Sequence, residues 1–218
     1  MNRRTILTVL GTTAAVGLGG CLGEDRDQDG TENGHTDDQA GNGSDAGTVI
    51  DRFETGPERP GCEKESESVE VERGDETREY ETAATIPYPS EPESFDGTDI
   101  VTFVEEFDRA YLRHDVLCRE RSGSILNVSY SVERSETYDW EEDITHVFVL
   151  RAAGASAGLD GDGYMWQADL GYSGVVYALD ETGVARTDFD DVSGLDPDEF
   201  EAHAPDPLEE GRLVAQFD

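Results

Sequence analysis

The chain has 218 residues, of which 51 are acidic and 16 are basic, and its formal net charge at pH 7 is −35. So negative a surface repels the phosphates of nucleic acids and anionic lipid headgroups, which argues against binding either by charge. Hydrophobic residues make up 35% of the chain, enough for one modest core, so we expect a single domain. The acidic excess, with Lys64 as the only lysine, indicates adaptation to a saline medium. At 1 M salt the Debye length is ~3 Å, so neighbouring carboxylates barely repel one another.

The first 20 residues have the composition of an export signal. Arg3 and Arg4 precede a mildly apolar run at residues 5–17, and no acidic residue occurs before Glu24. The run is too short, and too rich in Gly, Ala and Thr, to span a bilayer, which takes about 20 apolar residues. Small residues then lead to Cys21. A paired-arginine head, a short apolar core and small residues before a cleavage site predict a signal peptide at residues 1–20.

Two motifs in this segment resemble those of known signals. The stretch Asn2-Arg3-Arg4-Thr5-Ile6-Leu7 is similar to twin-arginine signals, and Leu18-Gly19-Gly20-Cys21 resembles a lipobox, in which a peptidase cuts before a lipid-bearing cysteine. With the acidic composition, these motifs resemble lipoproteins of halophilic archaea. The resemblance implies that the mature protein begins at Cys21 and is anchored by lipid to the outer, extracellular face of the cell membrane. The alternatives are a plain secretory signal or an uncleaved apolar terminus.

Residues 21–60 are expected to be the lipidated Cys21 and a disordered acidic linker, because so few large apolar side chains cannot offset the entropy of ordering the chain. Asp25–Gly30 matches the opening of a calcium-binding loop, but Thr36 stands where the loop needs a bidentate Glu, so we interpret the match as chance. Two sequences fit the acceptor pattern for glycosylation, at Asn42 and Asn127. Asn127 falls inside a predicted strand, which favours Asn42.

The rest of the chain, residues 61–218, is predicted to be one α+β domain. Val69 and Val71 alternate with glutamates, and residues 80–86 favour β structure, which predicts one or two strands. Three prolines at 87, 89 and 92 then predict an extended connector.

The strongest structural signal is an amphipathic helix predicted at residues 99–118. Its apolar stripe recurs at three- and four-residue spacing, and a set of charged residues is assigned to the opposite, solvent-facing side. The stripe is Ile100, Val104, Phe107 and Tyr111, flanked by Phe103 and Ala110; the charged set is Glu105, Glu106, Asp108, Arg109 and Arg113. We interpret the aromatic stripe as a core-packing face.

After Gly123 the period changes from helical to alternating. Strands are predicted at residues 126–132, 145–152, 164–179 and 184–189, with glycines bending the third and a tight turn at 180–183 before the fourth. A short helical turn at 196–202 and a last strand at 213–217 complete the prediction. One long helix followed by sequential strands predicts an antiparallel meander of four or more strands packed on the helix. This order resembles cystatin-like folds and, as an alternative, the cone-shaped folds of the nuclear transport factor 2 type.

The segment Gly154-Ala155-Ser156-Ala157-Gly158 matches the nucleophile-elbow pattern of serine hydrolases, and Asp188 and His203 follow in the appropriate chain order. An elbow requires a strand before the serine and a helix after it. The glycine-rich sequence that follows cannot form a helix, so we interpret 154–158 as a hairpin loop between two strands. A hydrolase using Ser156 remains the disfavoured alternative.

If Cys21 carries lipid, Cys62 and Cys118 are left as a possible disulfide in an oxidising compartment, or as two separate thiols. Neither lies in a C-x-x-C motif, which disfavours thiol-redox chemistry. Two cysteines and four scattered histidines show no metal-ligand spacing. Four aromatic residues of the third predicted strand either line a ligand surface or pack in the core, with packing favoured: Tyr164, Trp166, Tyr172 and Tyr177.

The sequence therefore contains no convincing catalytic arrangement, and we expect neither enzymatic activity nor a cofactor. Our hypothesis is a membrane-anchored extracytoplasmic lipoprotein that acts as a non-catalytic binding or envelope module. Its partner, a protein or a small molecule, is not specified by any motif.

Overall fold

The computed structural model describes residues 47–73, 76–95, 97–119 and 123–217. These residues all belong to one unit of the chain, 44–218. The predicted signal peptide, Cys21 and Asn42 lie outside the described residues. Among the residues that are described, no helix is both long enough and apolar enough to cross a membrane.

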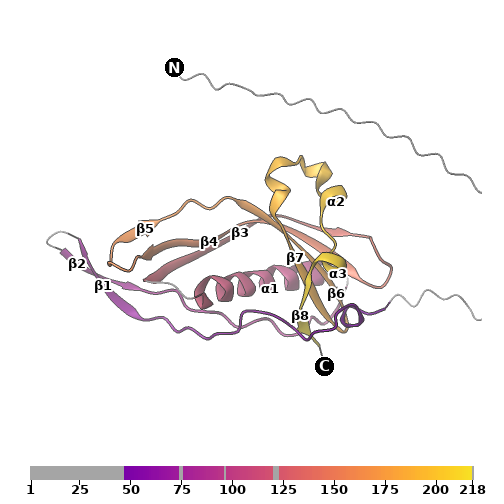
Figure 1. Cartoon of the computed structure of the whole chain (residues 1–218), viewed down its shortest axis with the longest axis horizontal. Helices are drawn as coiled ribbons and strands as arrows, with labels where there is room; N and C mark the ends of the chain where they lie inside the picture. The colour runs from indigo at the N-terminus through magenta and orange to yellow at the C-terminus, as the bar shows by residue number, and fades with distance from the viewer. Residues whose placement is uncertain (1–46, 74–75, 96, 120–122, 218) are drawn as a thin grey trace, which may run out of the picture. The chain divides into compact units, whose positions relative to one another are not determined.

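The centre of the domain is an antiparallel sheet of six strands (Figure 1). Its strand order is β3-β4-β6-β7-β8, and the short β5 pairs with the end of β4. The strands are β3 (Ser124–Tyr138), β4 (Thr145–Leu159), β5 (Met165–Gln167), β6 (Tyr172–Asp180), β7 (Gly183–Phe189) and β8 (Arg212–Gln216). The sheet is open, with β3 and β8 at its edges. The predicted antiparallel meander of four or more strands is confirmed.

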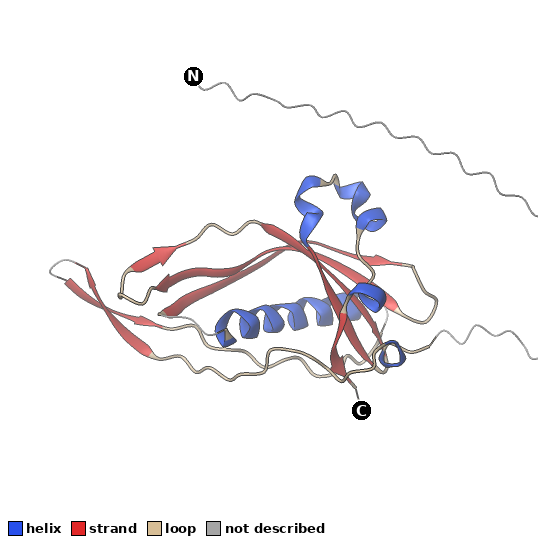
Figure 2. Cartoon of the chain, in the orientation of Figure 1, coloured by secondary structure: helices blue, strands red, loops and turns tan. Residues whose placement is uncertain are grey.

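Helix α1 (Gly97–Cys118) lies along one face of the sheet (Figure 2) and covers the predicted helix at 99–118. The predicted stripe is buried: Ile100 and Val104 are fully enclosed, and Phe107 is 1% exposed. These side chains pack on the helix-facing residues of four strands, which are Val147 and Val149 of β4, Val175, Tyr177 and Leu179 of β6, Val184 of β7 and Val214 of β8. Burial of this stripe is the main apolar contribution to the domain.

Short elements from both ends of the described chain cover the opposite face of the sheet, which we call the outer face. They are η1 (Ile50–Arg52), η2 (Asp190–Gly194), η3 (Pro197–Glu199), α2 (Phe200–His203) and α3 (Pro207–Glu210). Val49, Leu208 and Phe200 are buried there against residues of β4, β6 and β7. Both faces of the sheet are therefore covered.

The predicted domain boundary between residues 60 and 61 is wrong. The Val49 side chain is fully buried, and its backbone amide donates to Asp180 Oδ2 at 2.8 Å. Ile50 and Phe53 pack against the same cluster. These three residues are the only large apolar side chains that lie close together in the predicted linker, and this is why residues 47–53 join the core rather than the tether.

Two extended segments, 54–67 and 82–95, run beside α1 on the side away from β3 and β4, as Figure 2 shows. We call them the strap. Between them lies a separate hairpin of β1 (Ser68–Arg73) and β2 (Glu76–Glu81). The strap contacts the helix through hydrogen bonds: Arg113 Nε donates to the Ala84 carbonyl at 2.6 Å, and His114 Nε2 donates to the Ile86 carbonyl at 2.8 Å. Helix α1 thus lies between the sheet and the strap.

The predicted hairpin loop at 154–158 is also wrong, because β4 continues through it to Leu159 and pairs with β3 over its whole length. Small side chains permit close packing here. A Cβ at Gly158 would lie 2.5 Å from a ring carbon of Trp166, so only glycine admits that ring. The predicted third strand at 164–179 is instead two strands, β5 and β6, with Gly171 in the break between them.

Candidate functional site

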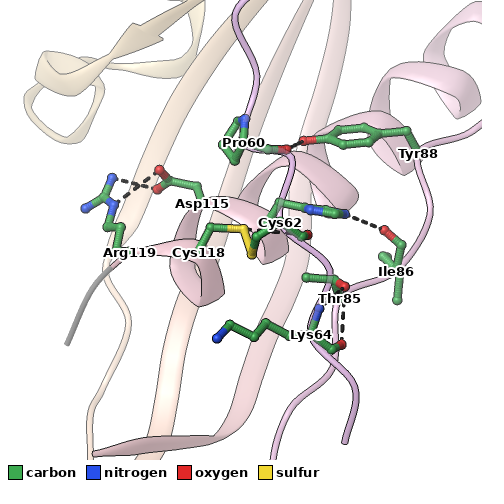
Figure 3. The surroundings of a disulfide bond; sticks show 10 residues. Pro60, Cys62, Lys64, Thr85, Ile86, Tyr88, Asp115, Cys118 and Arg119 are labelled. Carbon is green, nitrogen blue, oxygen red and sulfur yellow. Dashed lines mark hydrogen bonds and ion pairs between the residues drawn. A yellow bond between two sulfur atoms is a disulfide. The ribbon is translucent and has the colours of Figure 1, made fainter. Parts of the chain in front are cut away.

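A disulfide joins Cys62 in the strap to Cys118 at the end of α1, with Cα atoms 5.6 Å apart (Figure 3). The sequence left open whether these two cysteines are bonded. Near the disulfide, a hydrogen bond joins the two segments of the strap: the Tyr88 hydroxyl donates to the Pro60 carbonyl at 2.8 Å. The disulfide holds the strap against the helix, and the Tyr88 hydrogen bond joins the two segments of the strap to each other. The disulfide crosslinks the strap to the end of α1, and it uses both cysteines of the described part of the chain.

The environment of Tyr88 shows how tightly the strap is fixed. Its ring stacks on His114 at a centroid distance of 4.8 Å, and the Arg59 guanidinium lies 4.4 Å from the ring centroid on the strap side. Burial raises the pKa of Tyr88 to about 12, partly opposed by the Arg59 charge. The phenol is therefore a neutral hydrogen-bond donor at all physiological pH values.

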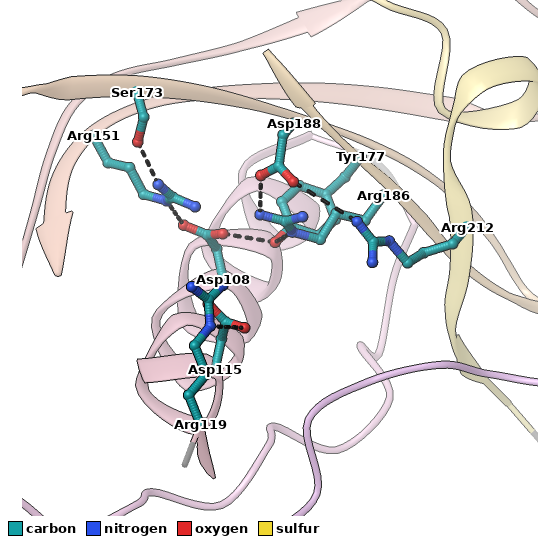
Figure 4. Close-up of polar contacts among 9 residues, drawn as sticks. All are labelled: Asp108, Asp115, Arg119, Arg151, Ser173, Tyr177, Arg186, Asp188 and Arg212. Atoms are coloured by element: carbon teal, nitrogen blue, oxygen red, sulfur yellow. Dashed lines mark hydrogen bonds and ion pairs between the residues drawn. The ribbon is translucent and has the colours of Figure 1, made fainter. Parts of the chain in front are cut away.

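The most unusual feature between α1 and the sheet is a buried charged cluster, shown in Figure 4. Asp108 was assigned to the solvent side of the helix, and this is wrong, because its side chain is fully buried. Arg151 of β4 donates from Nε to Asp108 Oδ2 and from Nη1 to Ser173 Oγ, the latter at 2.6 Å. The Tyr177 hydroxyl of β6 donates to the other Asp108 oxygen at 2.7 Å. One carboxylate of the helix therefore binds two adjacent strands.

The charged cluster continues along β6 and β7 towards the solvent. Arg186 donates from Nε to the Tyr177 hydroxyl at 3.3 Å and from Nη2 to Asp188 Oδ1 at 2.7 Å. Its guanidinium also lies 4.4 Å from the centroid of the Tyr111 ring. Asp188 is about half exposed and has a second, longer ion pair of 3.8 Å with Arg212 of β8. The cluster thus runs from the core to the surface.

Electrostatics keeps Tyr177, Arg151 and Asp188 in their usual charge states. Burial raises the pKa of Tyr177, and the neighbouring Asp108 charge raises it further, so the phenol stays protonated and donates. Burial by itself lowers the pKa of Arg151, but the Asp108 carboxylate raises it above the ordinary value. Two opposing effects also act on Asp188. Burial alone would raise its pKa, but the hydrogen bond and charge of Arg186 lower the pKa overall.

No buried side-chain atom of the charged cluster lacks a hydrogen-bond partner. Among the described residues, the buried side-chain atoms without a hydrogen-bond partner belong to His114, Tyr138 and His146, and none belongs to this cluster. A buried ion pair whose hydrogen bonds are all made holds neighbouring elements together, and it has little capacity left to bind or activate a substrate. We interpret the charged cluster as structural.

The structure does not bring together the three residues of the nucleophile-elbow pattern. Ser156 lies within β4, and its Oγ accepts from Asn127 Nδ2 at 2.6 Å and lies 2.8 Å from Ser129 Oγ. Asp188 belongs to the charged cluster, and His203 is exposed on α2. No hydrogen bond joins either of them to Ser156. A strand on both sides of the serine also lacks the strand-to-helix turn that the elbow requires.

The other residues singled out from the sequence are dispersed. Asn127 is exposed on β3, and its amide nitrogen donates to Ser129 and Ser156. Of the four aromatic residues, Tyr177 is fully buried, Trp166 is half-buried, and Tyr164 and Tyr172 are 72% and 56% exposed. They do not form one ligand surface. In the described part of the chain, no group of three or more potential ligand residues is arranged to hold a metal ion.

Two grooves at the surface of the described residues are large enough for a ligand. The first, of about 810 Å³, lies at the base of the β1–β2 hairpin beside the disulfide. Its charged residues are Glu63, Lys64, Glu65, Glu67 and Arg119, and none of its side chains has a buried atom without a partner. Mixed charges with satisfied contacts are typical of a solvated surface, so this groove has no feature that indicates a ligand.

The second groove, of about 760 Å³, follows the end of the edge strand β3, and we call it the β3 groove. Residues from three parts of the chain line it. They are Gly97, Thr98 and Val101 of α1, all five residues from Arg134 to Tyr138 of β3, and Pro197, Asp198 and Glu201 of η3 and α2. The first turn of α1 and the short outer-face helices therefore form its two walls, and the strand edge lies between them.

Polar contacts fix the side chains of the β3 groove. Arg134 donates from Nε to Glu136 Oε1 at 2.7 Å, and Ser135 Oγ donates to Glu105 Oε1 at 2.6 Å. The Tyr138 hydroxyl is buried beneath the groove and has no described partner. Burial, then the charges of Glu136 and Glu201, raise the pKa of Tyr138, so this phenol is neutral. A buried hydroxyl without a partner is uncommon in folded proteins and marks this groove as the candidate site.

Comparison with protein-family models, with characterised proteins and with solved structures finds no match for this chain. Sequence reasoning did not single out the β3 groove. Its residues come from positions up to about a hundred apart in the chain, and only the folded domain brings them together. Arg134 and Glu136, two charges of opposite sign at alternate positions beyond the predicted strand, were the only signal that β3 continues to Tyr138.

Proposed function

We propose that this chain is a lipid-anchored lipoprotein of a halophile, exported by a twin-arginine signal, whose domain acts as a non-catalytic binding module at the outer face of the cell membrane. The motif Leu18-Gly19-Gly20-Cys21, preceded by Arg3 and Arg4, supports the anchor. The single observation that carries the binding role is the β3 groove, which has an open strand edge as its floor and no catalytic pair among its residues.

The anchor also suits the position of the domain in the chain. Val49 is the first residue of the described chain that is buried in the core, and 27 residues separate it from Cys21 in the sequence. A chain this acidic has little electrostatic attraction for anionic headgroups, which leaves a covalent lipid as the attachment to the membrane. The domain would then act close to the membrane surface.

The anchor is tested by Cys21→Ser in the full chain, expressed in a haloarchaeal host. We expect the variant to appear in the medium, or to accumulate with its signal uncut, whereas the unchanged protein sediments with membranes. The matched control is Cys62→Ser, which removes a different cysteine and leaves the lipid site intact. A Cys21→Ser protein that stays in the membrane fraction with unchanged processing would refute the lipoprotein proposal.

Halophilic adaptation has a separate test. Carboxylates repel one another over about 10 Å at 0.1 M salt but over about 3 Å at 1 M salt. We therefore expect the melting temperature of the domain to fall steadily as potassium chloride is lowered between these concentrations. Scanning calorimetry across the series measures it. A melting temperature independent of salt would remove this part of the proposal.

We also propose that the fold is of the cystatin-like type. Support comes from a single long helix, α1, that precedes the strands β3, β4, β6 and β7 of an open antiparallel sheet. The cone type usually has more helices before its sheet, and α1 is the only α-helix in the described part of the chain before β3. A crystal structure that revealed further helices in front of α1 would favour the cone type instead.

The competing enzyme hypothesis gains no support from the contacts of Ser156, which are to Asn127 and Ser129 rather than to a base. A fluorophosphonate probe distinguishes the two classes directly, because it labels only an activated serine. Labelling of Ser156 in the native protein would favour a hydrolase, and the binding-module proposal expects none.

A further inference from the structure

The free edge of β3 is not accounted for by the packing of the domain itself. In the described part of the chain, β4 is the only strand that pairs with β3. On the side of β3 that faces away from β4, the Ala83 amide donates to the Ile125 carbonyl at 2.8 Å, near the start of the strand. From residue 127 onwards, no described backbone group hydrogen-bonds to this edge. An open edge presents unpaired N–H and C=O groups that can pair with another strand.

The β3 groove follows this free edge. All five residues from Arg134 to Tyr138 line it. Because successive side chains of a strand point to opposite faces of the sheet, a groove that touches five in a row has to run along the edge rather than over one face. Five residues of extended chain span roughly 16 Å. The groove therefore has the length and direction of a short added strand.

The walls of the groove leave room for one chain beside the edge. The first turn of α1, with Thr98 and Val101, borders it on the helix-facing side of the sheet. Pro197 and Glu201 border it on the outer side. A volume of about 760 Å³ falls within the range of formed binding pockets in proteins. An extended peptide that lies between an edge strand and a helix is a recurrent mode of recognition, in which backbone hydrogen bonds supply affinity and side-chain pockets supply specificity.

The charges of the β3 groove select the kind of chain that fits. The one cation that lines it, Arg134, is already paired with Glu136 and lies 6.0 Å from the centroid of the Phe200 ring. Asp198 and Glu201 are both exposed, and neither forms an ion pair with a described residue. A ligand here therefore meets uncompensated negative charge, which favours basic side chains next to its backbone.

We propose that the β3 groove binds an extended, basic segment of a partner polypeptide, which pairs with residues 134–138 as an additional strand of the sheet. This rests on the proposed function only in that the domain is a binding module. Backbone pairing supplies the contact along the edge, and Lys or Arg side chains of the partner contact Asp198 and Glu201. The partner's own backbone has to be extended over about five residues, which excludes a helical or proline-containing segment at the contact.

The test uses the full chain in detergent and a synthetic library of heptapeptides with Lys or Arg at every second position and any residue except proline between them. A library with Glu or Asp at the same positions is the comparison. We expect only the basic library to yield binders. Hydrogen exchange on the complex should show new protection of backbone amides within 134–138. Replacing the central residue of a binder with proline should abolish binding, because it removes a backbone donor.

Two variants test the charge assignment. Asp198→Arg combined with Glu201→Arg should weaken binding about tenfold or more at the lowest salt concentration at which the unchanged domain stays folded, since both carboxylates border the groove. Glu209→Arg combined with Glu210→Arg is the matched control, because it reverses two exposed carboxylates of α3 outside the groove and should leave affinity unchanged. Equal thermal melts of the two double variants would show that both remain folded.

The inference is overturned if the basic library yields no binder, if proline is tolerated, or if protection appears away from 134–138. Self-association that protects the same amides, with no peptide bound, would assign the edge to a second copy of this chain and also overturn it. These outcomes are independent of the anchor, because the Cys21→Ser experiment reports only where the protein resides. Loss of one proposal therefore does not decide the other.

Discussion

The two faces of the sheet differ in whether their buried polar groups have hydrogen-bond partners. On the face that contacts α1, Asp108, Arg151 and Tyr177 are buried, and each has its hydrogen-bond partners. On the outer face, Tyr138 and His146 are buried as well, yet the Tyr138 hydroxyl and both ring nitrogens of His146 have no described partner. A fully satisfied network holds a fold together, whereas an unsatisfied group that lines a groove, here Tyr138, marks a part of the fold that stability alone does not explain.

The difference separates architecture from function in this domain. The charged cluster ties the middle of α1 to β4 and β6, and the strap closes over the other side of the helix through the disulfide. Both sides of the helix are therefore fixed. The outer face is covered only by short helical turns, and the β3 groove opens where those turns meet the edge strand. This arrangement supports our proposal that binding occurs at the free edge of β3.

The largest effect that would distinguish the two faces is expected from Asp108→Ala. It leaves Arg151 buried without its carboxylate, and breaking a buried ion pair in this way costs about 3–5 kcal/mol of unfolding free energy. Asp188→Ala removes a half-exposed partner of the buried Arg186, which keeps its contact with the Tyr177 hydroxyl, and should cost less, about 1–3 kcal/mol. Urea denaturation at high salt measures both. Equal losses would mean that the buried end of the charged cluster is no more important than its solvent-exposed end.

The position of Asp108 also shows how far sequence reasoning reached. The helix and its stripe were predicted from spacing, and Phe107 and Tyr111 are buried as that spacing requires. Asp108 follows Val104 by four residues and precedes Tyr111 by three, so its spacing placed it on the same stripe. Because Asp108 is charged, however, we predicted that it faces the solvent. Charge is a poor guide where a distant cation, here Arg151 of β4, compensates it, and no local pattern reveals that partner.

Other errors have the same origin in distant contacts. The small residues of 154–158 lie between two predicted strands and were predicted as a hairpin loop, although pairing with β3 makes them part of β4. Val49 lies in a polar stretch of the sequence, and only the structure shows that Asp180, 131 positions away, accepts a hydrogen bond from its amide. The β3 groove depends on three separated segments and could not be foreseen at all. Local periodicity predicted the elements, and tertiary contacts determined their ends and the candidate site.

A smaller effect is expected when the strap is released from the helix. The double variant Cys62→Ser, Cys118→Ser removes a crosslink between residues 56 positions apart, which should lower the unfolding free energy by about 2–4 kcal/mol. The loss should appear equally on reduction of the unchanged protein. Because the disulfide lies at the other end of α1 from the β3 groove, affinity for the basic peptides should not change. A parallel loss of affinity would show that the two faces are coupled.

The smallest effect, and the only one of opposite sign, is expected at His146 on the outer face. Its ring is fully buried against Trp140, with centroids 4.9 Å apart, and neither ring nitrogen has a described partner. An apolar ring of similar shape removes this unsatisfied polar group. His146→Phe should therefore raise the unfolding free energy by about 1 kcal/mol near pH 8, measured by urea denaturation. A destabilised variant would show that the imidazole makes a favourable contact that the packing does not reveal.

The same variant should change how stability depends on pH. Burial lowers the pKa of His146 in the folded state, and the charges of Asp206 and Glu141 and a weak backbone contact with Ile144 only partly oppose this. The unfolded chain, with a histidine pKa of about 6.5, then binds more protons than the folded domain as pH falls below that value. The contribution of the neutral imidazole is fully present above about pH 6.5 and is lost as pH decreases towards the lowered pKa. Asp188, whose pKa is lowered from a normal carboxyl value, loses its contribution only at more acidic pH, below about 4.

The unfolding free energy, measured by denaturation between about pH 7 and pH 5, should therefore decline as pH falls. His146→Phe should flatten this decline, and His203→Gln, on the exposed surface of α2, should leave it in place. If the decline persists in His146→Phe, the polar groups responsible lie elsewhere, and the contrast between the two faces rests on Tyr138 alone.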